Sequence, residues 1–274
     1  MNVKRKAINY VLLTYGFTWA FTIPLVLLYR FKFNQEFSPW LILFLPGAYG
    51  PSIIALITRY KEGGRAAMLS LLRRLLEWKL NWKWYLSLLL LPLAWVVLAY
   101  VIATGNPAVL LDINWLEVIK MLPLFLLLAL PFGPLAEELG WRGYLLPLLQ
   151  SKYSAIVSSI LIGVVWTFWH TPMFWFPGAA IPSCLDLGVE SMLLYLIQVV
   201  SLSILMTVVF NRSSSSVVLA VYFHMTFNAS ENIIFSGADA MSVELEQNIY
   251  YITVALMTLL AILSIILFMK KKDV

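Results

Sequence analysis

Runs of about 20 predominantly apolar residues recur along this chain, and they constrain its fold more than any other feature. A helix needs about 20 residues to cross the hydrocarbon core of a bilayer, because each residue advances it by about 1.5 Å. The pattern therefore predicts eight membrane-spanning helices. Their expected ranges are 10–29, 40–57, 84–103, 116–135, 155–176, 192–210, 217–235 and 250–269.

The composition supports a membrane protein. Hydrophobic residues make up 61% of the 274 residues and charged residues only 12%, whereas soluble domains carry about 25% charged residues. The single cysteine, Cys184, excludes a disulfide within this sequence. The net charge of +5 does not point to nucleic acid, because the basic residues lie between apolar runs. We predict an all-α, polytopic membrane helix bundle, with residues 1–274 as one domain.

The basic residues also predict an orientation. Lys and Arg concentrate on the cytoplasmic side of membrane proteins. Here they gather before the first predicted span, in the connection 58–83 and after the last span, while the third, fifth and seventh connections contain none. We therefore expect both termini to be cytoplasmic. The residues Arg30, Lys32 and Lys120 do not follow this pattern.

Two carboxylates and a guanidinium occur together beside an apolar run, as Glu137, Glu138 and Arg142. Ionisable residues within a membrane are costly and are functional candidates by default. In a helix, Glu138 and Arg142 are four residues apart and share one face, while Glu137 points about 100° away. We expect Glu138 and Arg142 to pair and Glu137 to remain available for chemistry.

Both histidines of the chain fall in apolar runs, His170 in the fifth predicted span and His224 in the seventh. Asn228 follows His224 by four residues and so shares its helix face. If the fourth and fifth spans form a hairpin that turns near residues 151–153, Glu137 and His170 lie at similar heights. We therefore expect Glu137, His170, His224 and Asn228 to line one cavity that opens toward the cytoplasm.

These residues form an ordered pattern: Glu-Glu-x-x-x-Arg from Glu137, an aromatic residue four positions before His170, and His-x-x-x-Asn from His224. The pattern resembles that of the CPBP family of intramembrane proteases, which includes the Ras-converting type of CAAX prenyl endopeptidase. The motif-bearing core is about residues 116–235. One departure is Trp166, since this family usually has Phe there. The resemblance implies eight helices around a cavity and, for this chain, a prokaryotic cell membrane.

The resemblance also implies that the reaction is hydrolysis of a peptide bond. Glu137 and His170 would bind and deprotonate a water, and His224 and Asn228 would donate hydrogen bonds to the developing oxyanion. Glu138 and Arg142 would have a supporting role. The expected partners are the lipid bilayer and a peptide or protein substrate, which in such families is membrane-associated or lipidated in some cases. No cofactor and no nucleic acid are expected.

Two alternatives remain open from the sequence. Two histidines and one carboxylate also match a catalytic zinc site, in which Glu137, His170 and His224 would be ligands and Glu138 the base. A cavity with carboxylates and histidines also occurs in transporters, and related bacterial proteins include some with roles in immunity rather than proteolysis. Transporters often show repeated halves, and no such repeat is visible here.

Overall fold

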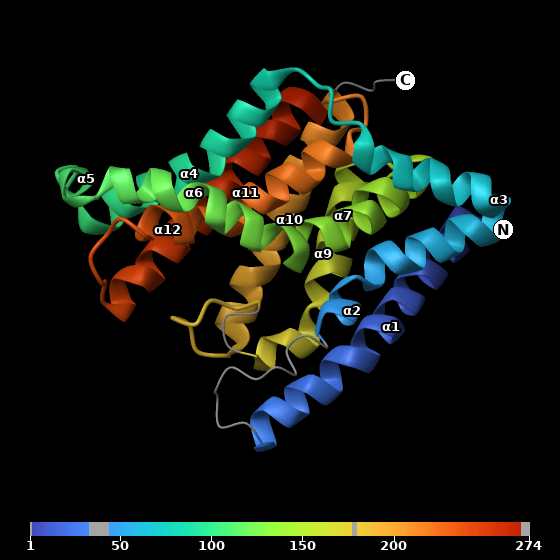
Figure 1. Cartoon of the computed structure of the whole chain (residues 1–274), viewed down its shortest axis with the longest axis horizontal. Coiled ribbons are helices and arrows are strands. Elements are labelled where there is room, and N and C mark those ends of the chain that lie inside the picture. Colours follow the sequence, from blue (N-terminus) through green and yellow to red (C-terminus); the bar gives the residue numbers. More distant parts are fainter. Residues whose placement is uncertain (1, 33–43, 177–179, 270–274) are drawn as a thin grey trace.

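The computed structural model describes residues 2–32, 44–176 and 180–269, and within these ranges it contains helices and no strand (Figure 1). The helices are α1 (Val3–Lys32), α2 (Phe44–Ala48), α3 (Gly50–Arg73), η2 (Arg74–Leu76), α4 (Trp82–Thr104), α5 (Val109–Asp112), α6 (Trp115–Ala129), η3 (Leu130–Phe132), α7 (Pro134–Gly140), η4 (Trp141–Leu145), α8 (Leu146–Gln150), α9 (Ala155–Trp169), η5 (Thr171–Trp175), α10 (Val189–Arg212), α11 (Val217–Phe235), α12 (Val243–Ser264) and η6 (Ile265–Met269).

Five helical segments among the described residues are long and apolar enough to cross a membrane. They correspond to the first, third, fourth, sixth and eighth predicted spans, and the prediction of a helical membrane protein is thereby confirmed. Their bounds are Val3–Leu28, Trp82–Thr104, Trp115–Phe132, Val189–Arg212 and Val243–Phe268.

The three other predicted spans differ from what we expected. The fifth ends early, because α9 stops at Trp169 and Pro172, which has no backbone N–H, lies in the 3₁₀ turn that follows. The seventh is present as α11, but α11 is not one of the five segments that are long and apolar enough to cross a membrane. Part of the second, residues 40–43, lies outside the described residues.

The helix that contains the end of the second predicted span also continues further than expected. We predicted an end at Ile57, but α3 extends to Arg73. Within it, Gly63 and Gly64 leave the helical conformation, and Gly64 has a φ of 67°, a left-handed value that favours glycine. The kink separates residues 50–62 of α3 from residues 65–73.

The fourth predicted span is not one continuous helix. It contains α6, the 3₁₀ turn η3 and then Gly133, after which α7 starts at Pro134. A proline at the first helical position is favourable because its missing N–H has no partner there anyway. Since α7 begins at this break, Glu137 and Glu138 lie on a short separate helix. The predicted hairpin turn is confirmed, because α8 ends at Gln150 and α9 begins after the capping residue Ser154.

The short helix α7 lies in the middle of the bundle with α9, α10 and α11 (Figure 1). On one side, α3 packs against α7 and α1 packs against α3; on the other, α4 and α6 pack against α11, and α12 packs against α4 and α10. The outer helices expose large apolar side chains such as Leu12, Leu127 and Leu259. The central helices instead bury polar ones, so the arrangement directs polar groups away from lipid.

Candidate active site

The predicted pair of Glu138 and Arg142 is present at the centre of the bundle. Both side chains are fully buried. Arg142 Nη1 donates a hydrogen bond to Glu138 Oε1 at 3.1 Å and lies 3.0 Å from Glu138 Oε2. The guanidinium also stacks over the Trp166 ring, 4.6 Å from its centre. Removing Glu138 alone would leave Arg142 as an uncompensated buried charge, which costs about 3–5 kcal/mol.

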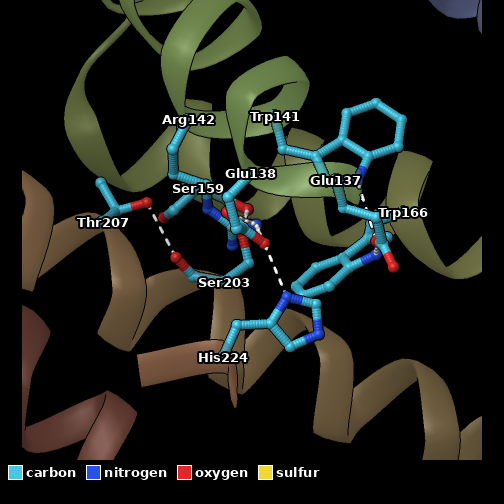
Figure 2. A network of polar contacts seen from close by, with 9 residues as sticks. All are labelled: Glu137, Glu138, Trp141, Arg142, Ser159, Trp166, Ser203, Thr207 and His224. Atoms are coloured by element: carbon cyan, nitrogen blue, oxygen red, sulfur yellow. Dashed lines mark hydrogen bonds and ion pairs between the residues drawn. The ribbon is translucent and has the colours of Figure 1, made fainter. Parts of the chain in front are cut away.

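Glu138 has a second partner that we did not predict. Its Oε1 atom lies 2.9 Å from His224 Nδ1, so Glu138 connects Arg142 on one side with His224 on the other (Figure 2). A carboxylate only accepts hydrogen bonds, and therefore His224 Nδ1 carries the proton. The opposite ring nitrogen, Nε2, donates only when the ring is doubly protonated.

One carboxylate oxygen of Glu137 accepts hydrogen bonds from two side chains, and the other oxygen is available to a ligand. Trp141 Nε1 donates to Glu137 Oε2 at 3.2 Å, and Trp166 Nε1 donates to the same oxygen (Figure 2). These two indole donors were not predicted from the sequence. A Phe at position 166 has no N–H to donate, so the contact from position 166 depends on the Trp of this sequence. Trp141 was missed although it follows Glu137 by four residues, a spacing that places both on one helix face.

His170 lies directly after the end of α9, where the chain turns into η5. Its Nδ1 atom is 2.9 Å from the backbone oxygen of Trp166. A carbonyl oxygen only accepts, so Nδ1 carries the proton and Nε2 keeps its lone pair. His170 can therefore accept a hydrogen bond from a water or a substrate through Nε2.

Two cavities meet at these residues. One of 460 Å³ and one of 770 Å³ are both lined by Glu137, His170 and Asn228, and the larger one is also lined by His224. The structure thus brings the four predicted residues to one cavity, although they come from α7, the end of α9 and α11. A cavity of this size in a membrane bundle has room for several residues of a peptide.

Gly133 is a further residue at this place. A Cβ atom at Gly133 would lie 3.2 Å from Asn228 Nδ2, 3.3 Å from Glu137 Oε1 and 3.6 Å from His224 Cε1. The absence of a side chain therefore leaves open the point toward which three candidate residues converge. The stretch Pro131-Phe132-Gly133-Pro134 could have indicated this position from the sequence, because proline and glycine mark breaks in helices.

The cavity does not extend in the expected direction. We predicted an opening toward the basic connections, but the larger cavity is lined by Pro182, Cys184 and Met241, which belong to connections without Lys or Arg. On the side of the basic connections, Arg74 donates hydrogen bonds to the backbone oxygens of Gly143 at 2.8 Å and Ser215 at 2.6 Å. These two hydrogen bonds connect η2 with η4 and with the segment that precedes α11.

The alternative zinc site is not assembled in the part of the chain that the structure describes. No three His, Cys, Asp or Glu side chains there are grouped so that they could hold a metal ion. His224 Nδ1 is bonded to Glu138, and Glu137 Oε2 to two indoles. We therefore derive no chemical step from a metal, and the role of Glu137, His170 and His224 as ligands stays a hypothesis from the sequence.

Comparisons with known proteins agree with the motifs. Residues 119–230 match the family model described as Type II CAAX prenyl endopeptidase Rce1-like. A protein of Methanococcus maripaludis described as CAAX prenyl protease 2 is 26% identical over 227 residues, which cover 78% of this chain and 80% of that protein. The matched part includes all six candidate residues between Glu137 and Asn228. Both similarities are to CAAX prenyl proteases, the kind of protein that the motifs resemble.

Proposed function

We propose that this chain, whose residues 119–230 belong to the Rce1-like family of type II CAAX prenyl endopeptidases, is an intramembrane endopeptidase. The observation that carries the proposal is the convergence of Glu137, His170, His224 and Asn228 on one cavity within a bundle of apolar helices. The substrate is a peptide or protein associated with the membrane.

Glu137 and His170 activate the water in this mechanism. Glu137 Oε1 and His170 Nε2 are both hydrogen-bond acceptors at the cavity wall. A water that donates one hydrogen to each acceptor has its lone pairs directed away from them, toward a substrate carbonyl carbon. As the water attacks, Glu137 takes one of its protons and later delivers it to the leaving amine.

Asn228 and His224 stabilise the oxyanion that forms on the substrate. Asn228 Nδ2 is a donor beside the open point at Gly133. His224 donates through Nε2 when its ring is doubly protonated, with Glu138 accepting from Nδ1. Donors directed at a developing oxyanion supply about 2.7–4 kcal/mol each in a well-studied protease. Glu138 and Arg142 are positioning residues in this account, because they act through His224.

The physiological substrate is best found in cells. Membrane-associated peptides from a strain with the wild-type protein are compared by mass spectrometry with those from a Glu137→Ala strain. We expect a peptide product that only the wild-type strain makes. Identical peptide profiles in the two strains, at equal protein levels, would contradict the proposed function.

We also propose the finer topology: eight spans in a prokaryotic cell membrane, with both termini and the connection from Arg59 to Lys83 on the cytoplasmic side. The proposal rests on the distribution of Lys and Arg. In a Cys184→Ser background, an impermeant thiol reagent added outside should label an exposed cysteine at position 239 and miss one at position 70. Outside labelling of Ser70→Cys, with Asp239→Cys protected, would reverse the orientation.

The metal-free mechanism has a separate test. We expect purified protein to contain far less than one zinc per chain and to keep its activity after dialysis against a chelator. We also expect Glu137→Gln to lose more activity than Glu138→Gln, because only Glu137 touches the water. Stoichiometric zinc, with activity lost on chelation and restored by zinc alone, would support the ligand set Glu137, His170 and His224 instead.

A further inference from the structure

A third ionisable residue continues the face of α11 that carries the site. Glu231 follows His224 by seven residues and Asn228 by three, a spacing that places all three on one side of the helix. Glu231 is partly buried and lines the larger cavity. Within the described residues it forms no hydrogen bond or ion pair, and the proposed mechanism does not use it. Carboxylates within a membrane bundle usually pair with another group, so the lack of a partner suggests that Glu231 binds a ligand.

A second carboxylate lies at the same end of the cavity. Glu246 of α12 also lines it, and the two carboxylates repel each other electrostatically. The surrounding wall is formed by polar contacts: Tyr250 donates to Gln198 Oε1 at 2.9 Å, and Gln247 Nε2 donates to the Cys184 backbone oxygen at 2.6 Å. The second contact fastens the connection before α10 to α12.

No positive residue compensates these carboxylates. Neither cavity is lined by a Lys or Arg among the described residues. Two like charges that face each other in a cavity of low dielectric constant are unfavourable without a counter-charge, so a cation is the complementary ligand. A free C-terminal carboxylate, in contrast, would be repelled at this end.

We propose that Glu231 and Glu246 form a substrate subsite for the ammonium or guanidinium group of a Lys or Arg side chain. This inference rests on the proposed function, since it names the class of peptide that the same cavity takes. Glu231 lies about 10 Å along α11 from His224. An extended peptide advances by about 3.3–3.6 Å per residue, so the basic residue lies within about three residues of the cleaved bond.

The test uses purified full-length protein and a mixture of synthetic peptides, whose cleaved bonds are located by mass spectrometry. One cleaved peptide is then made in three versions, with Lys, Gln or Glu at the position nearest the subsite. We expect kcat/KM for the Lys version to exceed that for the Gln version by about thirtyfold, the range for a buried charge pair. In Glu231→Gln and Glu246→Gln this ratio should fall toward one.

Two further variants test whether the preference depends on the charge of the subsite. Glu231→Lys should prefer the Glu version of the peptide over the Lys version. Glu244→Gln is the matched control, because Glu244 is an exposed acid on the same helix as Glu246 and does not line the cavity. It should keep the wild-type ratio. An equal ratio in wild type and Glu231→Gln would overturn the subsite.

A binding experiment separates this inference from the proposed function. Fluorescent Lys and Gln peptides are titrated onto Glu137→Ala protein, where no hydrolysis is needed. Tighter binding of the Lys peptide, lost on adding Glu231→Gln, supports the subsite even if the wild-type protein cleaves nothing. Equal binding of both peptides contradicts the subsite, even if cleavage of the peptide mixture supports the endopeptidase.

Discussion

Replacing Glu137 by Gln is expected to lower peptide-bond hydrolysis by about 10³-fold, a loss within the range for removing a general base. The amide of Gln keeps an oxygen that can accept from Trp141 and Trp166, so the local packing is retained. It cannot take a proton from the water. The fall should therefore appear in kcat, while KM changes little, because the proton transfer belongs to the transition state.

The measurement is the initial rate of cleavage by purified protein, with thermal unfolding in detergent as the check on folding. Glu117→Gln is the matched control, because Glu117 lies in the first turn of α6 and does not line either cavity. Its nearest ion-pair contact is Lys120 at 3.7 Å. The Glu117→Gln variant should retain full activity. Among the other site residues, His170→Ala and His224→Ala should also abolish cleavage, whereas Asn228→Ala should cost less, because one oxyanion donor remains. Wild-type activity in Glu137→Gln would show that another group activates the water.

Replacing Gly133 by Ala is expected to lower kcat by about 100-fold, although it adds only a methyl group. The new Cβ atom would stand 3.3 Å from Glu137 Oε1 and 3.2 Å from Asn228 Nδ2, where the water and the substrate carbonyl have to fit. A displacement of about 1 Å at a reacting centre costs roughly 10² in rate. The variant tests whether the open point is needed for the reaction.

The matched control for this variant is Gly188→Ala, because a Cβ atom at Gly188 meets nothing within 4 Å. It should retain wild-type activity. Thermal unfolding should be similar for both variants, since the space at Gly133 opens toward the cavity. Full activity in a folded Gly133→Ala protein would place the reacting atoms elsewhere in the cavity.

The sequence predicts the features that depend on local periodicity. Apolar runs of sufficient length predicted the five membrane-length helices, because lipid selects for them directly. The spacing of Glu138 and Arg142 predicted their ion pair, because residues four apart meet on a helix. Helix-face spacing and the estimated heights of the residues predicted that Glu137, His170, His224 and Asn228 share a cavity, which all four line.

The contacts between distant segments were not predictable in the same way. His224 and Glu138 are 86 positions apart, and only the packing of α7 against α11 brings them together. The direction of the cavity also depends on tertiary packing, since Pro182, Cys184 and Met241 line it from two connections that no side-chain pattern places together. Glu231 was not predicted as a site residue, because a single acid in an apolar run does not indicate its neighbours.

The helix breaks were the remaining source of error. The fourth predicted span was expected to be one helix, but it breaks at Gly133, between η3 and the start of α7. The early end of α9 places His170 at a turn rather than within a helix. In both cases the break directs a site residue into the cavity, and an apolar run alone does not show where a helix ends.

The most direct test of the account is cleavage of one substrate peptide in water enriched in ¹⁸O, by purified wild-type protein and by Glu137→Gln. We predict that the wild-type product carries one ¹⁸O atom in its new C-terminal carboxylate, and that the variant forms product about 10³-fold more slowly. Equal rates of product formation by the two proteins would contradict the assignment of Glu137 as the group that activates water.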